Sequence, residues 1–151
     1  MPALPMQLRV AEVVFTLTQF DDVHQVTITL EGKPVEGAVN LKPADVEVVI
    51  PRILVESPVP GESVTSPLKV SGTANVFEGT VSYSVNAPDS AELDDGFTTA
   101  MGQEWGHRGN FTFTSTSTST TQQHGLGRVV LWEVSMKDGS HMNIYEVSVN
   151  M

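Results

Sequence analysis

The stretch that decides the fold is SPVPGESVTSPLKVSGTANVFEGT, residues 57–80. Pro58, Pro60 and Gly61 predict a turn near its start, because proline has no amide hydrogen to donate to a sheet. From residue 68 to residue 74, apolar or small side chains then alternate with polar ones. This period of two predicts a strand with one buried face.

Further alternating runs surround this stretch. Residues 53–55 and 81–87 predict strands before and after it, and residues 97–101, 111–113, 130–136 and 145–149 predict four more. Asp138-Gly139 predicts the hairpin turn between the last two. Seven strands separated by turns within about 100 residues are typical of an immunoglobulin-like antiparallel β-sandwich. The side chains expected inside it are Leu68, Val70, Tyr83, Phe113, Trp132 and Val134.

Two segments of this half are expected to be loops. Residues 92–96 form an acidic run after the turn at Pro88. Residues 112–121 are almost entirely Ser and Thr, which fits either an extended sheet edge or a mobile loop. Low complexity and the absence of apolar residues after Phe113 favour a loop for residues 114–121.

The N-terminal residues predict a helix followed by a strand. Leu4, Leu8, Ala11 and Phe15 recur at helical spacing, and residues 5–19 are therefore expected to be helical. Residues 23–30 predict a strand whose apolar face holds Val26, Ile28 and Leu30. A turn at residues 31–34, a linker at 36–45 and a short strand at 46–50 are expected to follow.

Two family resemblances accompany these patterns. The second half contains the motifs Ser57-Pro58, Pro60-Gly61, Ser66-Pro67-Leu68, Val70–Ala74, Phe77–Val81, Leu131–Ser135 and Lys137–Ser140. As a set they resemble the immunoglobulin-like domain of bacterial spore germination proteins, the Gmad family. In the first half, residues 13–20, 23–26 and 30–35 resemble the C-terminal part of the GerMN domain of sporulation and germination proteins.

The resemblances imply two parts, a partial GerMN-like segment at residues 1–44 and a Gmad-type sandwich at 45–151. The earlier strands of the GerMN domain have no counterpart here, which leaves the apolar faces of the first part to be covered by something else. We expect a homodimer through residues 5–35, in which a second copy covers them.

Composition limits the functions. The chain has 151 residues, a net charge of −10 and no cysteine, which excludes disulfides, thiolate zinc sites and a cysteine nucleophile. The acidic balance argues against nucleic acid and against anionic lipid surfaces, since both need basic side chains. Residues 1–5 have neither the basic region nor the apolar region of a signal peptide. No apolar run in the sequence reaches the length of a membrane helix.

No set of residues predicts catalysis or a cofactor. Asp89, Glu92, Asp94 and Asp95 could offer oxygens to calcium, but a solvated acidic turn is the favoured interpretation. His24, His107, His124 and His141 show no zinc-ligand spacing. No serine has the setting of a nucleophile elbow, so neither a triad nor a hydrolase is expected.

One segment offers a candidate contact. Trp105 lies in a glycine-rich run with His107 and Arg108, and an exposed indole there could bind a partner or stack on a sugar. The resemblance to spore germination proteins implies a module of the cell envelope or spore, as part of a larger exported protein. With no catalytic set in the sequence, the expected function is a non-enzymatic module that docks a partner protein or the cell wall. The alternative is a carbohydrate- or peptidoglycan-binding module of a cell-surface lipoprotein.

Overall fold

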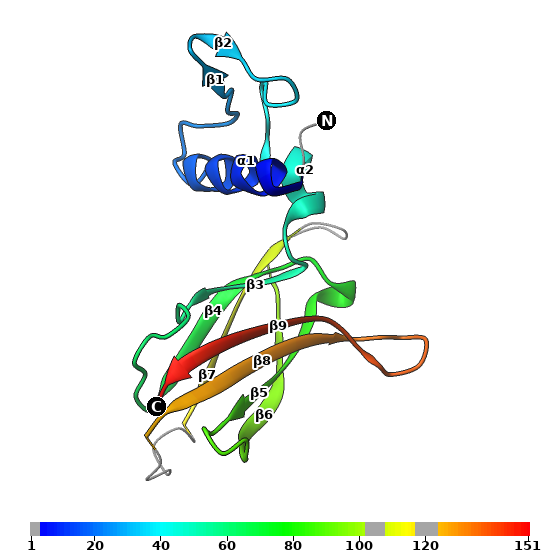
Figure 1. Cartoon of the computed structure of the whole chain (residues 1–151). Coiled ribbons are helices and arrows are strands. Elements are labelled where there is room, and N and C mark those ends of the chain that lie inside the picture. The colour runs from blue at the N-terminus through cyan, green and yellow to red at the C-terminus, as the bar shows by residue number, and fades with distance from the viewer. Residues whose placement is uncertain (1–3, 102–107, 117–123) are drawn as a thin grey trace. The chain divides into compact units, whose positions relative to one another are not determined.

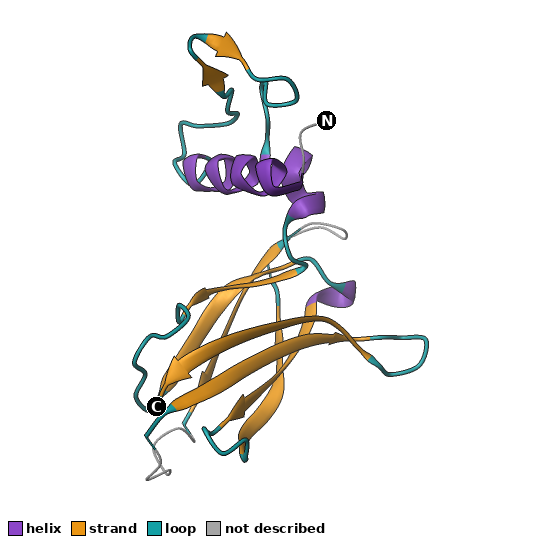
Figure 2. Cartoon of the chain, viewed as in Figure 1, coloured by secondary structure: helices purple, strands orange, loops and turns teal. Residues whose placement is uncertain are grey.

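The computed structural model describes residues 4–101, 108–116 and 124–151. Two compact units make up the chain, Met1–Pro51 and Arg52–Met151, and each is described by itself (Figures 1 and 2). The division follows Pro51, whereas the sequence places the boundary after residue 44, because residues 38–50 pack with the N-terminal unit.

The N-terminal unit has one long helix and several short elements. They are helix α1 (Leu4–Leu17), strands β1 (Thr29–Leu30) and β2 (Lys33–Pro34), helix α2 (Pro43–Val46) and the 3-10 helix η1 (Glu47–Val49). The helix expected at residues 5–19 is thus present. The strand expected at 23–30 is reduced to Thr29–Leu30 and an isolated bridge between Val26 and Leu41.

The buried face of α1 overlaps the predicted one in part, through Ala11 and the partly buried Phe15. Val10, Ala11 and Val14 are buried, whereas Leu8 is exposed. Apolar side chains cover more than one face of this helix, so their spacing alone does not select the inner one. The residues that pack around the buried face include Val26, Ala38 and Val46.

The strand predicted at residues 46–50 is wrong, because α2 and η1 occupy this position. Pro43 stands in the first turn of α2, where its fixed φ and missing amide hydrogen suit a helix. The backbone N–H of Lys42 donates to Oδ2 of Asp45 at 2.8 Å, which satisfies one donor at the helix start. These local bonds outweigh the alternation of Val46, Val48 and Ile50.

Unit Arg52–Met151 is a sandwich of two antiparallel sheets, as predicted. One sheet has the order β3-β4-β7 and the other β6-β5-β8-β9. The strands are β3 (Ile53–Ser57), β4 (Leu68–Ala74), β5 (Thr80–Asn86), β6 (Glu92–Thr99), β7 (Gly109–Ser115), β8 (Leu126–Val134) and β9 (His141–Asn150), with a 3-10 turn η2 (Phe77–Gly79) between β4 and β5.

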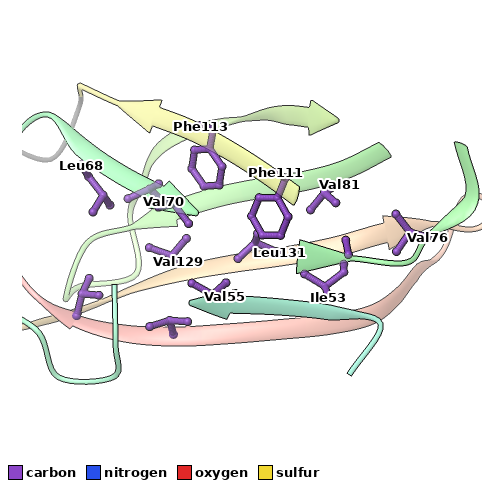
Figure 3. Close-up of a cluster of buried hydrophobic side chains, with 14 residues drawn as sticks. Ile53, Val55, Leu68, Val70, Val76, Val81, Phe111, Phe113, Val129 and Leu131 are labelled. Carbon is purple, nitrogen blue, oxygen red and sulfur yellow. The ribbon is translucent and has the colours of Figure 1, made fainter. Parts of the chain in front are cut away.

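The core lies between the two sheets (Figure 3). Val70 opposes Phe113 on the neighbouring strand of the smaller sheet, and both are buried. Tyr83 of the larger sheet stacks on the ring of Phe113 at 3.7 Å between centroids. The expected inner positions of Leu68, Val70 and Phe113 are confirmed, while Tyr83 is only partly buried.

The inner face of β8 is the opposite of the predicted one. Val129, Leu131 and Glu133 are buried, whereas Trp132 is half-buried and Val134 is exposed. Met136 lies beyond the strand and is also exposed. Apolar side chains occupy both faces of β8, so the alternation is compatible with either orientation, and the longer apolar series proved to be the outer one.

Two predicted loops are partly strand. Residues 92–96 belong to β6, where Gly96 leaves room for the ring of Tyr83. Thr112–Ser115 continue β7, while residues 117–121 lie outside the described residues. The hairpin predicted at Asp138-Gly139 joins β8 to β9 as expected.

The connection between β3 and β4 forms a seam along the end of β9. The N–H of Gly61 donates to the carbonyl of Ser148 at 2.7 Å, and the N–H of Asn150 donates to that of Glu62 at 2.8 Å. The N–H of Val64 in turn donates to the carbonyl of Asn150 at 2.8 Å. The C-terminal end of β9 is therefore hydrogen-bonded on both edges.

Candidate functional site

The outer face of the four-stranded sheet is the candidate site. Phe97 of β6 opposes Ser82 of β5, and Ser82 opposes Trp132 of β8. Directly opposed residues point to the same face of a sheet. Because Val81 and Leu131 face the core, these three side chains face away from it.

A β-bulge brings a fourth side chain into this row. The register shifts between Leu131 and Glu133, so that residues 143 and 144 of β9 oppose the single residue Trp132. Asn143 has a positive φ of 52°, which fits a bulge position. Ile144 consequently lies beside Trp132 on the outer face.

This end of the outer face is apolar. Phe97 is 73% exposed, Ile144 60% and Val134 42%. Trp132 is half-buried, and its indole stacks on the imidazole of His141 at 4.4 Å between centroids with 21° between planes. We call Phe97, Trp132, Val134 and Ile144 the apolar half of the face.

The adjoining rows of the same face are acidic. Asp95 of β6 opposes Ser84 of β5, and Glu146 of β9 opposes Val130 of β8. Nη1 of Arg128 lies 3.7 Å from Oε1 of Glu146. Nη2 of Arg128 also donates to the hydroxyl of Ser90 at 3.3 Å. The acidic half of the face consists of Glu92, Asp95 and Glu146, with Arg128 as its cation.

A buried carboxylate fixes the bulge from the inner side. Glu133 is 5% exposed, and its Oε1 accepts the N–H of Phe77 at 2.9 Å. Its Oε2 accepts a hydrogen bond from Nδ2 of Asn143 at 2.7 Å. Both oxygens therefore have partners, which a buried charge requires. These bonds hold the bulge that places Ile144 next to Trp132.

The predicted contact segment is only partly described. Trp105 and His107 lie outside the described residues. The guanidinium of Arg108 donates to Oγ1 of Thr73 at 3.2 Å and to its carbonyl oxygen at 3.4 Å. Arg108 is therefore held against β4, on a different sheet from the apolar half.

The carboxylates of residues 92–96 do not converge. Asp94 and Asp95 are successive residues of a strand, so their side chains leave on opposite faces. Asp94 shares the face of Tyr83. Burial raises the pKa of Tyr83, and the charges of Asp94 and Asp95 raise it further. Within the described residues, no three His, Asp or Glu side chains gather as a metal site would require.

The N-terminal unit has a small apolar pocket of about 110 Å³. Its apolar lining residues are Val10 of α1, Leu41, Val46, Val48 and Val49. Its one acidic side chain, Asp45, is engaged at the start of α2. The pocket therefore suits an apolar side chain and offers little for catalysis.

Sequence reasoning missed the outer face because its residues come from three strands. Phe97 and Ile144 are isolated apolar residues among polar ones, and Trp132 and Val134 were expected inside. The available signal was the two-sided apolar pattern of β8, which leaves one apolar side for solvent or for a partner.

Comparisons with known proteins agree with the fold. Residues 52–140 match the family described as immunoglobulin-like domain of bacterial spore germination, and residues 3–36 match the family described as sporulation and spore germination. No characterised protein and no solved structure gave a match. None of the helices in the described ranges is long and apolar enough to cross a bilayer. Because the match at residues 52–140 covers more than half of the chain, the chain belongs to the family of immunoglobulin-like domains of bacterial spore germination.

Proposed function

We propose that the sandwich is a non-enzymatic interaction module that docks a partner protein through the outer face of its four-stranded sheet. The observation that carries this proposal is the apolar half, where Phe97 and Ile144 are largely exposed on either side of Trp132. Exposed apolar patches of this kind on soluble domains mark contact surfaces.

The composition of the face favours a protein partner. Aromatic residues are enriched at the centres of protein interfaces, and polar residues form the rim. Trp132 stands on the inner strand β8 of this face, Phe97 stands on β6 at its edge, and Asp95, Glu146 and His141 lie around them. Aliphatic side chains such as Ile144 and Val134 pack well on protein and contribute little to the binding of a hydroxyl-rich sugar.

The sheet edges are poorly suited to docking by strand addition. Two adjacent carboxylates, Asp94 and Asp95, stand on edge strand β6, and charges on an edge oppose further pairing. The other edge strand, β9, is bulged at Asn143 and covered by residues 61–64 at its end. The exposed face is therefore the better surface for a partner.

Family membership supports a role in spore germination or sporulation. Such a module would work outside the cytoplasm, in the cell envelope or spore, as part of a larger exported protein. The acidic composition of the chain supports neither nucleic acid nor anionic lipid as its partner.

The test is retention of a partner by the immobilised full chain. Phe97→Ser with Ile144→Ser removes the apolar anchors, while Val39→Ser with Val59→Ser is a control at two exposed positions elsewhere. In the first assay, sporulating cells are cross-linked and their envelope extract is applied to the immobilised chain. In a separate assay, the chain is mixed with purified peptidoglycan and the peptidoglycan is pelleted. We expect one protein to be retained by the native chain and the control but not by the anchor variant.

Equal retention by the anchor variant would contradict the proposal. Pelleting with peptidoglycan that is lost in the anchor variant would instead assign the face to carbohydrate, the alternative function.

A further inference from the structure

We infer that the partner segment carries a cationic side chain next to an apolar anchor, so that it covers both halves of the outer face. This inference rests on the proposed function and specifies the chemistry of the partner. The observation behind it is that the acidic half lies directly beside the apolar half on the same face of the sheet.

The two halves meet along more than one strand. On β6, Asp95 precedes Phe97 by two residues, and on β9, Glu146 follows Ile144 by two residues. Two residues of a strand span about 7 Å. A partner side chain seated on Phe97 therefore lies within one side-chain length of the Asp95 carboxylate.

The acidic half is only partly neutralised. Arg128 pairs with Glu146, whereas Glu92 and Asp95 form no ion pair with any described residue. Residues 52–151 as a whole contain eleven Asp and Glu and five Lys and Arg. The surface that meets a partner is thus negative as well as apolar.

Docking of a neutral or acidic partner would leave these carboxylates uncompensated. Covering a carboxylate without a partner costs free energy, while a Lys or Arg brought against it recovers part of that cost. A cation two residues from the anchor in an extended segment, or three to four residues away in a helix, would reach Asp95. The charges of the face therefore select a basic partner and its spacing.

The test uses a displayed library of random 12-residue peptides selected against the full chain. We expect enriched peptides with an aromatic or large aliphatic residue and a Lys or Arg at one of these spacings. The affinity of the best peptide is then measured for the native chain, Asp95→Lys and Glu56→Lys. Glu56 is an exposed residue of β3, so its reversal is a control with the same change in net charge.

Asp95→Lys should weaken binding about tenfold at low salt, and Glu56→Lys by much less. High salt should weaken the native complex and reduce the difference between the variants. Enrichment of peptides without cations, equal affinity for Asp95→Lys, or no enrichment at all would overturn the inference. Competition by soluble chitohexaose would overturn it too, in favour of a glycan.

Failure of this inference and failure of the proposed function give different results. If Phe97→Ser with Ile144→Ser abolishes peptide binding and Asp95→Lys does not, the face is a docking site without charge selection. If the Phe97 and Ile144 variant binds normally, the face is not the docking site.

Discussion

The carboxylate of Glu133 accepts the backbone N–H of Phe77 at 2.9 Å, across 56 residues of sequence. This bond joins the turn η2 to the bulged end of β8, at a position where Glu133 is almost fully buried. Glu133→Ala would leave the Phe77 N–H and the Asn143 amide without this acceptor. We expect a loss of about 1.5–3 kcal/mol of unfolding free energy, measured by urea denaturation. Glu146→Ala, at an exposed carboxylate, should change it by far less, and an equal loss in both variants would refute the role of Glu133.

The orientation of β8 predicts unequal effects for two neighbouring residues. Leu131 is fully buried, and Leu131→Ala should cost about 2–5 kcal/mol because it opens a cavity in the core. Trp132→Ala removes a larger side chain from the outer face and should cost less. Thermal or urea unfolding of both variants decides this. A greater loss for Trp132→Ala would mean that the strand faces the other way.

Gly72 of β4 has no room for a side chain. A Cβ there would meet the carbonyl oxygen of Leu54 and lie 2.9 Å from Cζ of Phe111. Gly72→Ala should therefore lower stability by about 1–3 kcal/mol or prevent folding, as overpacking does. Ser71→Ala, one residue away, should be nearly neutral. Unfolding is monitored by circular dichroism. A Gly72→Ala variant that is as stable as the native chain would contradict this packing.

Tyr83 makes stability depend on pH in the alkaline range. Its pKa in the folded chain is raised, chiefly by burial and also by Asp94 and Asp95, above the value of about 10 of an unfolded tyrosine. The folded state therefore holds the phenol proton more tightly, and its contribution is complete below pH 10. It should be lost as the pH rises through the folded pKa. Urea midpoints between about pH 9 and pH 11 should fall less steeply for Tyr83→Phe than for the native chain, with Tyr145→Phe as control.

The homodimer through residues 5–35 stays a prediction, with α1 as its main contact. Met6, Val13 and Leu17 are 48%, 40% and 40% exposed, and their spacing of seven and four places them on one helix face. Light scattering should give twice the chain mass for the full chain. Val13→Lys with Leu17→Lys should give one chain mass, and Glu12→Lys, at an exposed position on another side of the helix, should stay dimeric. A native chain that is monomeric at high concentration rules the dimer out.

The parts of the fold that the sequence predicted are those where one face is plainly polar. In β4, Lys69, Ser71 and Thr73 alternate with apolar or small residues, so the inner face is unambiguous and was predicted correctly. In β8 both faces are apolar, and the choice depends on partners that a local pattern cannot show. A buried glutamate at position 133 is acceptable only because Phe77 of the turn η2 and Asn143 of the neighbouring strand β9 supply donors.

The candidate site could not be predicted from the sequence for a related reason. Phe97, Trp132 and Ile144 come to lie in one row across the sheet only through the register of β6, β5, β8 and β9, and Ile144 also needs the bulge. A shift of one residue in any pairing would send these side chains to the other face. Patterns within single strands do not fix that register.

The seam along β9 determines how this domain responds to mechanical tension. Its last residues are held by β8 on one edge and by residues 61–64 on the other. A pulling force applied at Met151 along the strand is therefore shared by the hydrogen bonds of its two edges. The C-terminal strand should then withstand a larger force than a strand that is held on one edge alone.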